Sequence, residues 1–168
     1  MLKKLIILLL YLLPFLSVGQ KAIVDENMEQ NERNNSYDFY ECKESEYLFE
    51  EGLAVIEFVD ENTIYIKNET NTGYYGTHIS FKIDKKMNVC DLKYYTWDDV
   101  EDGSITDFKT QDFDIRLNKN PFKTGIHDLQ GIYHLKIISD FNPGEMLSKE
   151  NIKPKTTHFT YRAVFECK

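Results

Sequence analysis

The chain has 168 residues, with 20 basic and 28 acidic side chains and a net charge of −8 at pH 7. An acidic chain is repelled by the phosphates of nucleic acids and by anionic membrane surfaces, so the sequence argues against both as partners. Its length is typical of one domain with a sizeable hydrophobic core, and we expect a single domain.

The first 19 residues have the pattern of a secretory signal peptide. Two lysines precede an apolar run over residues 5–18, and the small residues Ser17 and Gly19 stand at the positions that a signal peptidase reads. We therefore expect cleavage before Gln20 and a secreted or periplasmic protein. The apolar run of about 14 residues is shorter than the roughly 20 that a membrane-spanning helix needs, so the sequence argues against a permanent membrane span.

Residues 20–37 are rich in Asp, Glu and Asn and contain few apolar side chains, which predicts a flexible polar leader. The domain itself is then expected over residues 38–168. Helix-forming residues at 45–51, followed by Gly52, predict one short helix near the start of this domain.

From residue 53 onward, apolar residues recur at every second position, which is the period of a half-buried strand. Residues 53–59 and 63–67 flank a polar turn and predict a hairpin. The same alternation predicts five further strands, at residues 79–83, 90–95, 113–117, 133–137 and 159–167.

These strands alternate apolar with charged residues, as antiparallel sheets with one solvated face require. The sequence therefore predicts a mainly β fold, an antiparallel β-sandwich or small barrel of about seven strands with one short N-terminal helix. An α+β fold is the alternative.

The three cysteines, Cys42, Cys90 and Cys167, all follow the predicted signal peptide, and disulfides form in the compartments that exported proteins enter. We predict a disulfide between Cys42 and Cys167, which lie near the two ends of the domain. Another pairing and a fully reduced chain are the alternatives. Cys90 alternates in phase with Leu92 and Tyr94, which predicts a buried side chain.

Aromatic residues make up 14% of the chain and are dense at two places, the pair Tyr74 and Tyr75 and the segment 94–97, which begins with the pair Tyr94 and Tyr95. Adjacent residues on a strand point to opposite faces, so at least one member of each tyrosine pair should leave the core. The candidate binding residues are Tyr74, Tyr75, Tyr95 and Trp97, because aromatic side chains offer a large contact area at low entropic cost. Ordinary packing within the sheet is the alternative.

An acidic segment follows Trp97. Compared with an EF-hand loop, Asp98 takes the first ligand position and Asp102 the fifth, but Lys109 stands where a bidentate Glu is required, which excludes an EF-hand. Asp98 and Asp102 are candidate Ca²⁺ ligands in a site of another kind. A solvated acidic turn is the alternative, and no other cofactor is indicated.

The sequence contains neither of the serine-nucleophile patterns Gly-x-Ser-x-Gly and Ser-x-x-Lys. It favours a non-enzymatic secreted or periplasmic binding domain for a protein or small-molecule ligand. The alternatives are a small extracytoplasmic hydrolase that uses the acidic cluster around Asp98 and Asp102, and an envelope-associated structural module.

Overall fold

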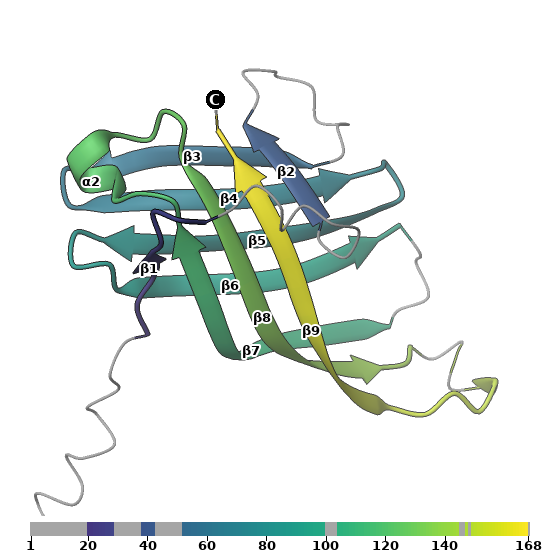
Figure 1. Ribbon diagram of the computed structural model, residues 1–168. Coiled ribbons are helices and arrows are strands. Elements are labelled where there is room, and N and C mark those ends of the chain that lie inside the picture. Colours follow the sequence, from purple (N-terminus) through teal and green to yellow (C-terminus); the bar gives the residue numbers. More distant parts are fainter. Residues whose placement is uncertain are drawn as a thin grey trace, which may run out of the picture.

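The computed structural model describes residues 20–28, 38–42, 52–99, 104–144, 147 and 149–167. Within these residues, nine strands form one sheet in the order β1-β7-β8-β9-β2-β3-β4-β5-β6, and this sheet curls into a half-barrel (Figure 1). The predicted mainly β fold is confirmed. The architecture differs in detail, because nine strands form a single curled sheet where we expected about seven strands in a sandwich or small barrel.

The strands are β1 (Ile23–Val24), β2 (Asp38–Cys42), β3 (Leu53–Asp60), β4 (Thr63–Asn71), β5 (Tyr75–Asp84), β6 (Val89–Asp98), β7 (Ile105–Leu117), β8 (Gln130–Asn142) and β9 (Lys155–Glu166). Helix α2 (Pro121–Thr124) is a single turn that Asn120 caps by accepting a hydrogen bond from the backbone N–H of Phe122. The helix predicted at residues 45–51 lies outside the described residues. Among the described residues, no helix has the length and hydropathy to cross a membrane.

Two antiparallel groups of strands build the half-barrel. Strands β3 to β6 form one group and β7 to β9 the other. Strand β2 joins them, since it pairs in parallel with β9 on one side and with β3 on the other. In Figure 1, β7 to β9 cross one face of β3 to β6 at a steep angle, so the inner faces of the two groups enclose the core.

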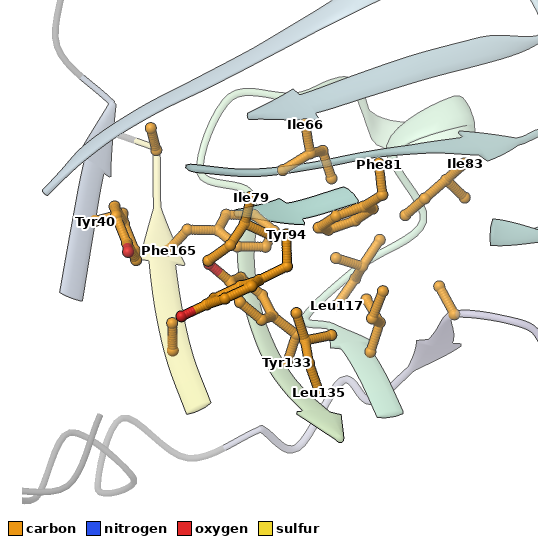
Figure 2. Packing of buried hydrophobic residues seen from close by; sticks show 14 of the residues in the cluster. Tyr40, Ile66, Ile79, Phe81, Ile83, Tyr94, Leu117, Tyr133, Leu135 and Phe165 are labelled. Atoms are coloured by element: carbon orange, nitrogen blue, oxygen red, sulfur yellow. The ribbon is translucent and has the colours of Figure 1, made fainter. Parts of the chain in front are cut away.

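The core follows from the alternation of apolar residues. On β4 and β5 the inward positions are fully buried, and they meet inward side chains of β7, β8 and β9 (Figure 2). Each large apolar side chain that is fully buried stabilises the fold by about 1.5–3 kcal/mol. The largest of these residues are Tyr40, Ile64, Ile66, Ile79, Phe81, Ile83, Ile115, Leu117, Leu129, Tyr133, Leu135 and Phe165.

One polar side chain takes an inward position in this core. Asn68 of β4 is fully buried, and its Nδ2 donates a hydrogen bond to the Tyr133 hydroxyl at 2.9 Å. A buried amide without such a partner would cost about 1–3 kcal/mol. The hydrogen bond therefore links the two groups of strands across the core.

Residues 20–25 connect the two edges of the sheet. Strand β1 pairs in parallel with the end of β7, and Lys21 forms a bridge with Asn88, which directly precedes β6. The Val89 N–H donates to the Gln20 carbonyl at 3.0 Å, and Ala22 is buried. The described part of the predicted polar leader thus contains a strand, and both backbone hydrogen bonds and the buried Ala22 attach this segment to the sheet.

The predicted pair Cys42 and Cys167 lies at disulfide distance, with Cα atoms 4.7 Å apart. The parallel pairing of β2 with β9 brings the two residues together, since Cys42 ends β2 and Cys167 directly follows β9. The spacing of the two Cα atoms lies within the usual range for a disulfide.

Cys90 is exposed, so the prediction of a buried side chain was wrong. A β-bulge is the reason. Ser80 pairs with Lys93 and Lys82 pairs with Cys90, so β6 contains one residue more than β5 at this point. The extra residue reverses the alternation and turns Cys90 outward.

Candidate binding face on strands β4 to β6

The outer face of β4, β5 and β6 carries polar and aromatic side chains in cross-strand rows. Since Ile66, Asn68 and Ile79 point into the core, the residues that alternate with them point outward. Glu69 pairs with His78, and His78 in turn pairs with Tyr95. We call the following residues the outer aromatic patch: Lys67, Glu69, Gly76, His78, Ser80, Lys93, Tyr95 and Trp97.

Tyr95 stacks on His78. The ring centroids are 4.5 Å apart and the ring planes differ by 14°. Tyr95 remains 43% exposed, whereas the His78 side chain is only 12% exposed. The imidazole therefore supports one face of the tyrosine ring and leaves much of the ring accessible to solvent.

Trp97 lies against Gly76, its partner on β5. A Cβ atom on Gly76 would lie only 2.5 Å from Cε2 and from Nε1 of the indole. Only glycine permits this approach of a ring to the backbone. Tyr95 and Trp97 are thus both held against β5.

Two neighbouring side chains on the outer face, Ser80 and Glu69, lie near the two ring nitrogens of His78. Its Nε2 lies 3.1 Å from the Ser80 hydroxyl, and its Nδ1 lies 3.8 Å from Oε1 of Glu69. Burial lowers the pKa of His78, Glu69 partly opposes this shift, and Lys67 and Lys93 add to it. The imidazole is therefore neutral at pH 7.

The Glu69 carboxylate, the His78 imidazole and the Ser80 hydroxyl follow one another in the order found in serine hydrolases, but their geometry does not fit catalysis. The distance between Glu69 and His78 exceeds that of a hydrogen bond, and Ser80 is buried. Strand β5 also pairs with β4 on one side and β6 on the other, so its backbone N–H groups donate to these strands and offer no oxyanion hole. The contacts orient His78 beneath Tyr95.

The four predicted binding residues do not form one surface. Tyr95 and Trp97 lie together in the outer aromatic patch. Tyr75 alternates with Gly76 and therefore lies on the opposite face of β5, where it is 60% exposed. Tyr74 precedes β5 and is 76% exposed.

The predicted calcium site is only partly described. Asp98 ends β6 and pairs with Tyr75, whereas Asp102 lies outside the described residues. Within the part of the chain that the structure describes, no three His, Cys, Asp or Glu side chains are grouped so that they could hold a metal ion.

Sequence reasoning did not identify His78, Glu69 and Gly76 as parts of the patch. The signal that could have found them is the register of the β4–β5 hairpin, which pairs Glu69 with His78 and Asn71 with Gly76. Comparisons with protein-family models, curated proteins and solved structures found no match.

Acidification should destabilise the protein through His78. Its pKa in the folded chain lies below the usual 6.5, so its contribution to stability is complete above about pH 6.5 and is lost as the pH falls through the folded-state pKa. Between about pH 7.5 and pH 5, we expect the urea midpoint of the wild type to fall further than that of His78→Gln. Equal decreases in the two proteins would contradict this role, because all other titratable groups are common to both.

Proposed function

We propose that this chain is an exported, non-enzymatic binding domain that recognises its ligand through the outer aromatic patch. The observation that carries the proposal is the placement of Tyr95 and Trp97 on the outside of the sheet, each held against a residue of β5. Rings that pack only to fill a core would lie on the inner face, whereas Tyr95 is exposed on the outer face and Trp97 is only partly buried there. Two fixed aromatic side chains instead form a surface that a ligand can cover.

Export is supported by the signal-peptide pattern of residues 1–19 and by the pair Cys42 and Cys167 at disulfide distance. Cleavage before Gln20 would also leave every described strand intact, including β1. The mature chain would then carry a net charge of −10, which favours neutral or basic ligands.

Preorganised aromatic side chains are efficient binding groups. Tyr and Trp are enriched among the residues that dominate binding energies, and replacing such a residue by alanine often costs about 2 kcal/mol or more. His78 and Gly76 already hold the two rings before a ligand arrives, so little side-chain entropy remains to be lost on binding.

The test compares patch variants with a variant of the same residue type on the opposite face. Immobilised wild type, Tyr95→Ala, Trp97→Ala and the control Tyr75→Ala are exposed to culture fluid and envelope extract of the source organism, and the retained material is quantified. We expect the wild type and Tyr75→Ala to retain the same component. The two patch variants should retain at least about tenfold less of it. Equal retention by all four proteins would show that the patch does not bind.

A further inference from the structure

The exposed Tyr95 ring and the partly buried Trp97 ring of the outer aromatic patch form a row along β6. Tyr95 and Trp97 are two residues apart on one strand, which separates their Cα atoms by about 7 Å. Both point to the same face, and His78 and Gly76 support them from β5. A ligand that contacts both rings must therefore extend along the strand.

Groups that form hydrogen bonds surround this row. Lys67 and Glu69 of β4 form an ion pair at 2.7 Å, and both side chains are partly exposed. Lys93 of β6 is exposed and lies two residues from Tyr95 on the same face. A ligand on the rings thus meets ammonium donors and carboxylate acceptors at its edge.

We infer that the ligand of this patch is a neutral saccharide chain, an inference that rests on the proposed binding function. One face of a pyranose ring presents C–H groups, whose partial positive charge is attracted to the negative face of an aromatic ring. Its hydroxyl groups lie around the edge and both donate and accept hydrogen bonds. Successive sugar units of one chain can then cover Tyr95 and Trp97 in turn.

Other ligand classes fit this surface less well. A lipid or apolar helix needs a continuous apolar area, but charged side chains stand beside the rings. A polyanion is repelled by the net charge of the mature chain, and Lys67 is already paired with Glu69. An uncharged ligand with many hydroxyl groups meets neither obstacle.

Native affinity electrophoresis in gels that contain a soluble polysaccharide tests this inference. The neutral probes are laminarin, hydroxyethylcellulose, galactomannan and dextran, and polygalacturonate is the acidic comparison. We expect at least one neutral probe to retard the wild type and Tyr75→Ala equally. Trp97→Ala and Tyr95→Ala should bind that probe at least about tenfold more weakly. Circular dichroism of each variant separates loss of binding from loss of folding.

The two experiments distinguish failure of this inference from failure of the proposed function. If no neutral probe retards the wild type, while the patch variants still lose the component retained from the native extract, the saccharide inference is overturned and the binding function stands. A peptide identified as that component would have the same effect. If patch substitutions change neither measurement, both proposals are wrong. Retardation that Trp97→Ala and Tyr95→Ala leave unchanged would place saccharide binding elsewhere.

Discussion

Replacing Cys42 and Cys167 by serine should lower the free energy of unfolding by about 5 kcal/mol. The two cysteines are separated by 125 residues, so their link removes much of the conformational freedom of the unfolded chain. The link also ties the short strand β2 to the end of β9. Since the whole stability of a domain is commonly about 5–15 kcal/mol, the double variant should be marginally folded.

Equilibrium unfolding in guanidinium chloride measures this effect. Cys90→Ser is the matched control, because the Cys90 side chain is exposed and its replacement should change stability by less than about 0.5 kcal/mol. Non-reducing peptide mapping should recover the fragments that contain Cys42 and Cys167 joined to each other. Recovery of both as free thiols from exported protein would refute the link.

Replacing Phe165 by alanine should cost about 3–5 kcal/mol. Phe165 is fully buried, and its ring centroid lies 6.3 Å from that of Tyr133. The ring also covers Gly131 of β8, where an added Cβ atom would lie 2.2 Å from the ring. Truncation would therefore leave a cavity against the backbone of the neighbouring strand.

A double-mutant cycle with Gly131 tests this packing. In the wild-type background, Gly131→Ala should cost about 1–3 kcal/mol, because the new methyl group displaces the Phe165 ring. In the Phe165→Ala background the ring is gone, so most of that cost should disappear and the two substitutions should not be additive. Additive effects in urea unfolding would show that the ring does not lie over Gly131.

The strand content of the fold could be predicted because alternation is a local signal. Ile64 and Ile66 predict β4, and Ile79 and Ile83 predict β5. Strand β7 is longer than the predicted segment at residues 113–117, because its pairing with β8 continues to Ile105 through mostly solvated residues and a bulge. Alternation marks only the part of a strand that faces the core.

Pairings between distant segments could not be predicted. Nothing local in residues 38–42 indicates that this strand lies between β9 and β3. The attachment of Ile23 and Val24 to β7 depends on backbone groups at the two sheet edges, which composition does not reveal. Periodicity identifies which face of a strand is apolar, but the partner of the strand depends on the whole chain.

Only part of the candidate site could be predicted, because the pairing of its strands is not a local property of the sequence. Tyr95 and Trp97 stand out by composition, and the two-residue period places them on one face. Their support by His78 and Gly76 depends on the β5–β6 register, and the bulge between Cys90 and Lys93 shifts that register within the strand. The separation of Tyr75 from the patch likewise requires the pairing to be known.

The central place of β2 in the sheet affects when folding can finish. Tyr40 pairs with Phe165, so the strand that joins the two groups acquires its second neighbour only after nearly the whole chain has been synthesised. Such a high contact order predicts slow folding, and a nascent chain that lacks β9 should remain loose. This delay would suit a polypeptide that is threaded through a translocation channel before it acquires its compact form.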